Sequence, residues 1–170
     1  YLKKINSPLF RRGAGGEARI VICSLGDASL TEGEASEALQ VAVLKKLPII
    51  YLVQDNEWGI SVTSSEARNM NAFKFAKGFK CLERVSIDGS DFFESYETMK
   101  NVVNKVRKNS TPFLVHAKVP LLGHHTSGVR KEFYRTDEDF AEQAKNDPFP
   151  ILKKHLVHLE ISENALNEIE

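Results

Sequence analysis

Four short apolar runs, rich in β-branched and aromatic residues, constrain the fold more than any other feature of the sequence. We predict strands at these runs, which cover residues 19–25, 48–53, 84–87 and 113–119. Each run is nearly continuous rather than alternating with polar residues, as in strands that are buried on both faces. Helix-like segments separate the runs, and this alternation indicates a parallel sheet with right-handed crossovers. The predicted fold class is therefore α/β, a three-layer parallel sheet flanked by helices.

Helical segments are predicted between and after the strands, at residues 33–46, 72–77, 92–108, 136–145, 150–156 and 162–170. Thr31 and Glu34 have the spacing of a capping box ahead of the first helix. Residues 123–131 show no periodicity and are predicted to form a loop. We interpret the chain as one domain, which divides into a lead-in (1–18), an α/β core (19–120), a loop (121–136) and C-terminal helices (137–170).

The composition excludes several classes of protein. The chain has 23 Lys plus Arg and 23 Asp plus Glu, so it lacks the basic excess typical of a nucleic-acid binder. Its longest apolar stretch, residues 47–53, is far shorter than the roughly 20 residues of a membrane span. Cys23 and Cys81 are too few for a disulfide framework and suggest a reducing compartment. The chain begins at Tyr1 without an initiator Met, and we expect it to be part of a larger protein.

Short polar segments follow the predicted strands, and in an open parallel sheet ligands bind beyond the carboxyl ends of the strands. The segments are Gly26-Asp27-Ala28-Ser29, Asp55-Asn56-Glu57-Trp58-Gly59, Asp88-Gly89 and Gly123-His124-His125. We expect all four along one edge of the sheet, with Asp88-Gly89 serving only as a turn. The first segment precedes a helix start, which favours a bound phosphate. The Asp27 carboxylate and the Asn56 amide oxygen suit Mg²⁺ shared with phosphates.

Each candidate also has a simpler structural interpretation. Asp27 could be only a cap or turn residue, and Asn56 could be a turn former. Adjacent histidines in a loop are more often solvated than catalytic. His155 and His158 lack a third ligand nearby in sequence, which argues against a zinc site. The glycine-rich run 13–16 precedes a strand instead of following one, so we interpret it as a flexible turn.

Two blocks of the sequence resemble a known enzyme family. The run GDASLTEGEASEALQVAVLKKLPIIYLVQDNEWGIS (26–61) resembles the thiamine diphosphate motif, which joins Gly-Asp to a later Asn-containing turn. The run GHHTSGVRKEFYRT (123–136) resembles a loop that begins with Gly-His-His or His-Gly-His and ends in Tyr-Arg. Together they resemble the alpha subunit of the decarboxylating first component of 2-oxo-acid dehydrogenase complexes. The resemblance covers residues 19–154 and implies a thiamine diphosphate-binding fold.

The resemblance implies roles for the matching residues. Asp27, the Asn56 side chain and the Trp58 carbonyl would bind Mg²⁺ together with the cofactor phosphates and a water. The implied cofactor-binding set also includes Gly26, Ala28, Ser29, Gln54, Gly59, Ile60, His125 and Arg135. His125 would be catalytic, as a donor that stabilises the developing intermediate or assists acyl transfer. Arg130 and Arg135 would anchor the loop or contact phosphate, with Arg135 the better match.

The sequence departs from the family pattern at several positions. Ala28 stands where Gly is usual, and Asp55 replaces the first of two Asn residues, which adds a negative charge near the phosphates. Gln54 stands where branched-chain enzymes carry a phosphate-binding Arg. Thr126 replaces the phosphorylated Ser of the regulated mitochondrial enzymes, and Gly128-Val129 replaces the acidic pair after it. Kinase control is therefore not expected.

The implied function is decarboxylation of a 2-oxo acid, followed by transfer of the acyl group to a lipoyl group. The cofactor carries out the organic chemistry while the protein positions it. A partner beta subunit or fused beta region would supply the Glu that activates the cofactor, so we expect the isolated chain to be inactive. A lipoyl-bearing acyltransferase component and a homo- or hetero-oligomer are further implied. Gly123-His124-His125 favours branched-chain acids such as 2-oxoisovalerate, and pyruvate or acetoin dehydrogenase are the alternatives.

Two rival functions remain open at this point. One is another thiamine enzyme of the transketolase type, and the other is a domain that kept the fold and lost the chemistry. Ala28, Gln54 and Asp55 are the residues that favour the second. Neither nucleic acid nor a membrane is an expected partner. The expected location is the cytoplasm, or the mitochondrial matrix if the protein is eukaryotic.

Overall fold

The computed structural model describes residues 19–169, and four parallel strands form its centre. The strands are β1 (Val21–Gly26), β2 (Ile49–Asp55), β3 (Glu83–Asp88) and β4 (Phe113–Lys118). Their order in the sheet is β1-β2-β4-β3. Each predicted strand is present close to its predicted range, which confirms the parallel α/β prediction. The glycine-rich run 13–16 and the rest of the predicted lead-in lie outside the described residues.

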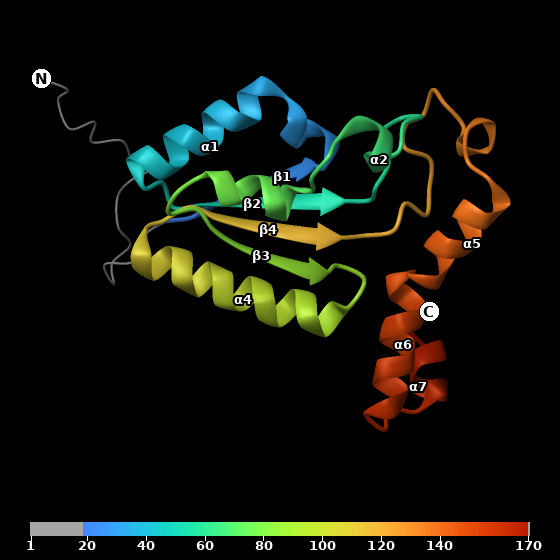
Figure 1. The fold of residues 1–170 in the computed structure, drawn as a ribbon. Coiled ribbons are helices and arrows are strands. Elements are labelled where there is room, and N and C mark those ends of the chain that lie inside the picture. Colours follow the sequence, from blue (N-terminus) through green and yellow to red (C-terminus); the bar gives the residue numbers. More distant parts are fainter. Residues whose placement is uncertain (1–18, 170) are drawn as a thin grey trace, which may run out of the picture.

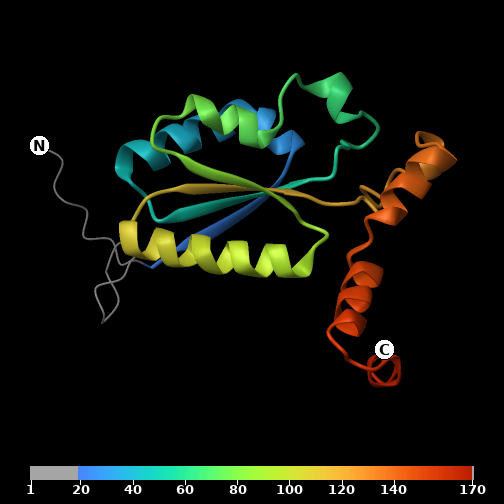
Figure 2. The same ribbon diagram turned by 60° about the horizontal axis from the view of Figure 1, so that its bottom comes forward.

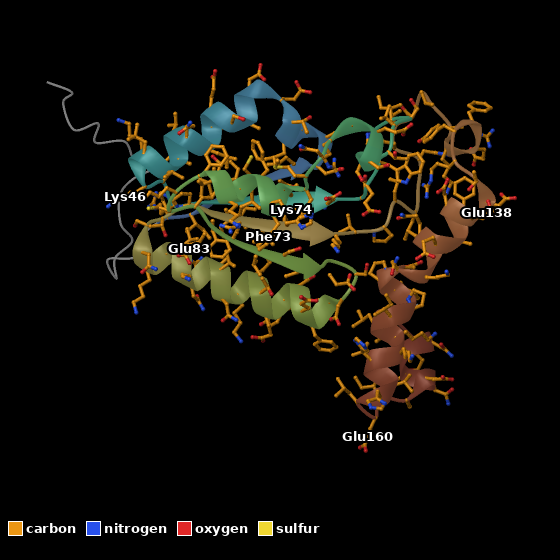
Figure 3. The ribbon with its side chains drawn as sticks, in the orientation of Figure 1. Lys46, Phe73, Lys74, Glu83, Glu138 and Glu160 are labelled. Atoms are coloured by element: carbon orange, nitrogen blue, oxygen red, sulfur yellow. The ribbon has the colours of Figure 1, made fainter. Side chains whose placement is uncertain are left out.

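Helices cover both faces of the sheet, so the predicted three layers are confirmed (Figure 1; Figure 2). The helices are α1 (Gly33–Lys45), α2 (Ser64–Ala67), α3 (Ala72–Phe75), α4 (Phe92–Asn109), α5 (Asp137–Lys145), α6 (Pro148–His158) and α7 (Glu163–Asn167). On one face α1 and α3 bury a cluster that includes Leu39, Val53 and Leu114. On the other face α4 buries Val102 and Val106 against the sheet. Figure 3 labels Phe73 of α3, whose ring lies under the Arg84 guanidinium of β3 at 5.1 Å.

The register aligns the carboxyl ends of the strands at one edge of the sheet. Gly26 of β1 pairs with Gln54 of β2, while Asp55 of β2 and Asp88 of β3 both pair with Lys118 of β4. The polar segments that follow the strands therefore begin beside one another, as predicted. This edge faces α5, which the chain reaches after β4 (Figure 1).

Local capping explains where the helices begin. Helix α4 begins after Asp91, whose Oδ1 accepts the N–H groups of Phe93 and Glu94 at 2.8 and 3.0 Å. The predicted capping box of Thr31 and Glu34 is wrong. Residues Ala28–Thr31 form a 3-10 turn, η2, in which the Thr31 hydroxyl donates to the Ala28 carbonyl at 2.7 Å. Glu32 is therefore the N-cap of α1, and it makes no side-chain cap hydrogen bond.

The C-terminal helices extend away from the sheet beyond its carboxyl edge (Figure 1; Figure 2). A capping box of Thr136 and Asp139 begins α5, and Asp147 caps α6 ahead of Pro148, so α6 starts earlier than predicted. The predicted loop contains a further 3-10 turn, η4 (Lys131–Phe133). Among the described residues, no helix combines the length and the apolar character needed to cross a membrane.

Candidate functional site

Four polar side chains gather on one face of the sheet near its carboxyl edge. Asp55 lies two residues after Val53, and His116 lies two residues after Leu114, so both share the face covered by α1 and α3. Asp27 follows β1, and Ser86 comes from β3, where it pairs with His116 in the register. Sequence reasoning identified Asp27 and Asp55 but missed His116, which stands in an otherwise apolar strand.

Arg68 joins Asp27 to Asp55. Its Nη2 donates to Asp55 Oδ1 at 2.8 Å, and its Nη1 makes an ion pair with Asp27 Oδ2. Little of any of these side chains reaches solvent, with 9% of Arg68, 4% of Asp27 and 6% of Asp55 exposed. Arg68 is the only side-chain partner of Asp27 among the described residues, so the Asp27 carboxylate has unused acceptor capacity. No signal in the sequence pointed to Arg68, because it follows the short α2 in a region without periodicity.

A second chain of hydrogen bonds leads from Asp55 into the sheet. His116 Nε2 lies 2.8 Å from Asp55 Oδ2, and Ser86 Oγ lies 2.8 Å from His116 Nδ1. An ionised carboxylate only accepts, so His116 Nε2 donates to Asp55 Oδ2. The His116 hydrogen bond and the Arg68 charge thus stabilise the ionised form of Asp55, the residue that departs from the family pattern.

The two carboxylates respond to burial in opposite ways. Burial raises the pKa of Asp27 above its ordinary value of 3.8, and the Arg68 contact only partly offsets this effect. Burial also favours the neutral form of Asp55, but the His116 hydrogen bond and the Arg68 charge together lower the pKa of Asp55 below 3.8. Asp27 is therefore the buried carboxylate whose charge is less well compensated.

The predicted metal ligands after β2 lie in a tight turn. Asn56 Oδ1 accepts the Trp58 N–H at 2.9 Å, and Asp55 Oδ1 accepts the Glu57 N–H at 3.1 Å. Glu57 has a positive φ of 63°, and the Gly59 N–H closes the turn on the Val62 carbonyl at 2.7 Å. The turn is held in place next to Asp27 by Arg68. Among residues 19–169, no three His, Cys, Asp or Glu side chains form a metal-binding group.

These donors fit a magnesium ion that phosphates help to coordinate. Such a site needs only one or two carboxylates, because phosphate and water oxygens complete the octahedron. The Asp27 carboxylate supplies buried oxygens with lone pairs that the Arg68 contact does not use, and the Asn56 amide oxygen can use a second lone pair. Gly26, Ala28 and Ser29 lie exposed around Asp27, where a ligand can reach them.

The remaining predicted cofactor residues lie around this turn. Gln54 is exposed, and it accepts from the Ser24 hydroxyl at 2.9 Å. It alternates with Val53 and Asp55, so it belongs to the opposite face of the sheet. Ile60 is 51% exposed. The cofactor roles of Gln54 and Ile60 stay predictions.

Loop 121–136 returns to the Asn56–Trp58 turn at its C-terminal end. The Arg135 guanidinium lies 5.2 Å from the centroid of the Trp58 ring and donates to the Leu121 carbonyl at 2.9 Å. The Tyr134 ring is 5.8 Å from that of Trp58. Arg135 is buried, and its Nη1 and Nη2 donate to the backbone carbonyls of Leu121 and Asp139 while Nε has no hydrogen-bond partner, which favours the predicted anchoring role over a phosphate contact. The structure thus brings together the two sequence blocks that carried the family resemblance.

His124, His125 and Arg130 of the loop are exposed. His125 is exposed, and its neighbour His124 accepts the Lys131 N–H through Nδ1 at 3.3 Å. Arg130 pairs with Glu132 at 3.3 Å on the surface. His155 contacts the Phe93 ring at a centroid distance of 5.9 Å. The catalytic role of His125 stays a prediction.

Two cavities flank the buried ion pairs. One of about 460 Å³ lies at the ends of β2, β3 and β4, and Asp55, Asn56, Ser86 and Lys118 are among its lining residues. Gln143 of α5 also lines this cavity. Another of about 360 Å³ is lined by Asp27, Leu30 and Arg68, among other residues. Both cavities open beside the predicted metal ligands.

Comparison with known proteins shows relatives along nearly the whole chain. The family model described as dehydrogenase E1 component matches residues 11–170. The chain is 31% identical over 157 residues to pyruvate dehydrogenase E1 component subunit alpha of Porphyra purpurea, covering 91% of the chain and 45% of the relative. It is 28% identical over 140 residues to 3-methyl-2-oxobutanoate dehydrogenase subunit alpha of Mycobacterium tuberculosis, covering 82% and 38%. The chain thus spans less than half the length of these relatives.

A solved structure shows the same kind of fold. Transketolase from Campylobacter jejuni superposes with a TM-score of 0.50 and 30% sequence identity. The superposition covers 59% of this chain and 15% of the transketolase chain. The shared part is the α/β arrangement of a thiamine diphosphate-binding fold.

Proposed function

Because the chain belongs to the dehydrogenase E1 component family, among its alpha subunits, we propose that it holds thiamine diphosphate through Mg²⁺ in a 2-oxo-acid dehydrogenase. One observation carries this proposal. Arg68 joins Asp27 to Asp55 across neighbouring strand ends, directly beside the Asn56–Trp58 turn. The two halves of the cofactor motif therefore form one site, with a buried carboxylate at its centre.

In this proposal the chain's residues hold and orient the cofactor. Asp27, the Asn56 amide oxygen and the Trp58 carbonyl hold the metal ion, and the exposed backbone of residues 26–29 contacts the phosphates. When bound, thiamine diphosphate supplies the electron sink for decarboxylation. Arg135 fixes the end of the loop against Trp58, which positions the segment that carries His125. His125 then donates a proton or hydrogen bond at the reacting end of the site.

The proposed substrate is a 2-oxo acid. Relatives named for pyruvate and for 3-methyl-2-oxobutanoate match the chain similarly well, so the comparisons favour neither. Gly123-His124-His125 is the feature that supports a branched-chain acid. The proposed partners are a beta subunit or region that supplies the activating Glu, and a lipoyl-bearing component that accepts the acyl group. Support for these partners comes from the match to the dehydrogenase E1 component family and from the relative named as an alpha subunit of such a component.

Calorimetric titration of thiamine diphosphate tests the proposal. The native protein should bind the cofactor in the presence of Mg²⁺, and EDTA or Asp27→Ala should abolish this binding. Glu97→Ala is a suitable control, because Glu97 is an exposed carboxylate on α4, which covers the opposite face of the sheet from α1 and α3. Binding that persists in EDTA would contradict the proposed metal role, and absence of any binding would contradict the proposed function.

A further inference from the structure

Among the described residues, Arg68 is the only side chain that makes ion pairs with both buried carboxylates, Asp27 and Asp55. Asp27 and Asp55 carry two negative charges against one guanidinium, in a place that solvent hardly reaches. Two carboxylates this close repel each other, and the charge of Asp55 further raises the pKa of Asp27. A positive charge between them is therefore required whenever both are ionised.

The two ends of the bridge are unequal. Asp55 accepts a hydrogen bond of 2.8 Å from Arg68 Nη2, and a further bond of 2.8 Å ties it to His116. Asp27 has Arg68 as its only side-chain partner among the described residues. Asp55 is thus held by two side chains, while Asp27 depends on Arg68 alone. If Asp27 turns toward another cation, Arg68 keeps its bond to Asp55.

We propose that Arg68 is the internal counter-ion of Asp27 and competes with the divalent cation for this carboxylate. This inference rests on the proposed function, because it takes Asp27 as a metal ligand. Without a metal ion, Arg68 neutralises Asp27 and keeps the site folded. When the cation binds together with a diphosphate, it displaces the guanidinium from Asp27, and Asp55 retains Arg68. Arg68 thereby weakens metal binding and makes it reversible.

Opposite effects of two substitutions test the inference. Mn²⁺ is the probe, and its binding to the native protein is measured by electron paramagnetic resonance with thiamine diphosphate present and absent. Arg68→Met removes the competitor and leaves the carboxylates in need of a cation, so it should tighten Mn²⁺ binding about tenfold. In Asp55→Asn, Asp27 is the only ionised partner left to Arg68, so Arg68 should compete more strongly for Asp27. This variant should therefore weaken Mn²⁺ binding by a similar factor.

The controls separate this inference from general damage to the site. Arg68→Met should lower the melting temperature of the metal-free protein, and Mn²⁺ should raise it more than in the wild type. Arg68→Lys keeps the charge and should bind Mn²⁺ nearly as the wild type does, so it serves if Arg68→Met fails to fold. If the wild type binds Mn²⁺ normally and Arg68→Met binds it equally tightly or more weakly, the proposed competition is wrong. The proposed function is not affected by that result. A wild type that binds no Mn²⁺ with the cofactor present overturns the proposed function as well.

Discussion

Asp27 and Asp55 are the same kind of side chain at similar depth, and their partners decide how each behaves. Asp55 has His116, Arg68 and the Glu57 N–H around its carboxylate, and these contacts lower its pKa. Asp27 has one ion pair, so burial dominates and raises its pKa. A buried charge without full compensation lowers stability, and such charges persist where a ligand needs them. The contrast supports the proposed metal-binding role of Asp27, whereas the contacts of Asp55 stabilise the structure around it.

We predict that Asp27→Asn stabilises the metal-free protein at neutral pH. The pKa of Asp27 is raised on folding, so its contribution to stability is fully present below the ordinary value of 3.8 and is lost as pH rises through the raised value. Asn carries no charge, so the advantage of Asp27→Asn should grow with pH from about 4 to about 7. Urea denaturation in EDTA measures this difference. A variant that is less stable at neutral pH than the wild type would show that Arg68 fully compensates Asp27.

Asp55→Asn should have the opposite pH dependence. The pKa of Asp55 is lowered on folding, so its stabilising contribution is present above 3.8 and is lost as pH falls through the lowered value. At neutral pH we expect a loss of about 1–3 kcal/mol in the free energy of unfolding, because charge-assisted bonds to Arg68 and His116 are weakened. Urea denaturation at several pH values should show the two proteins converging in acid. A constant difference at every pH would point to packing instead of charge.

At the scale of elements, the junction between β3 and α4 depends on a glycine. The Gly89 N–H donates to the Lys118 carbonyl at 2.7 Å. A Cβ at this position would lie 2.6 Å from Val119 Cγ1 and 2.8 Å from the Lys118 oxygen. Asp88-Gly89 is thus a turn, as predicted, and its backbone lies directly against the end of β4.

Gly89→Ala should therefore destabilise the protein by about 1–3 kcal/mol, because backbone atoms must move to admit the methyl group. Gly78→Ala is the matched control, since a Cβ there meets nothing within 4 Å, and it should leave stability unchanged or slightly increased. Chemical denaturation of both variants measures the effect. Equal stability of the two would mean that the β3–α4 junction relaxes without cost.

The elements also show how far the sequence predicts the structure. The central strands β2 and β4 were predictable because burial on both faces leaves a continuous apolar run, and α4 was predictable from its apolar stripe and its stop before Pro112. The expectation of burial on both faces is wrong for β1 and β3, because they lie at the edges of the sheet and are more exposed. The η2 turn was missed because a single 3-10 turn has no periodic pattern, and this error also misplaced the cap of α1. Asp27 and Asn56 could be predicted as site residues because the carboxyl ends of parallel strands meet at one edge of the sheet. Arg68 and His116 could not be predicted as site residues, because they meet the carboxylates only through contacts between elements that are distant in sequence.

At the scale of the whole molecule, the chain spans less than half the length of the relatives named above. We expect the chain by itself to decarboxylate neither pyruvate nor 2-oxoisovalerate, because the proposed activating Glu comes from a beta subunit or region. Turnover should require the full-length parent protein together with its beta partner, as measured by reduction of an artificial electron acceptor. Turnover by the chain alone would contradict the proposed division of the active site.

The C-terminal part of the molecule is coupled to the sheet through Trp58, which is the single Trp of the sequence. Its ring is buried at 8% exposure and has Tyr134 and Arg135 against it. Arg135 also lies 4.9 Å from the Phe140 ring of α5, so one guanidinium links the β2 turn to the first of the three helices that extend from the sheet. The fluorescence of Trp58 therefore reports on this link directly.

Arg135→Ala should shift the Trp58 emission to longer wavelength, because water reaches the ring where the guanidinium and the loop end covered it. The loss in stability should be about 1 kcal/mol, the size of a partly desolvated cation–π contact, and circular dichroism should show the sheet intact. Arg130→Ala removes an exposed Arg from the same loop and should leave the emission unchanged. If Arg135 acts only as an anchor, the variant should hold the phosphates normally and lose the ordering of the His125 segment. Cofactor affinity would then remain near that of the wild type while turnover of the assembled enzyme falls, whereas a parallel loss of affinity would assign Arg135 to the phosphates.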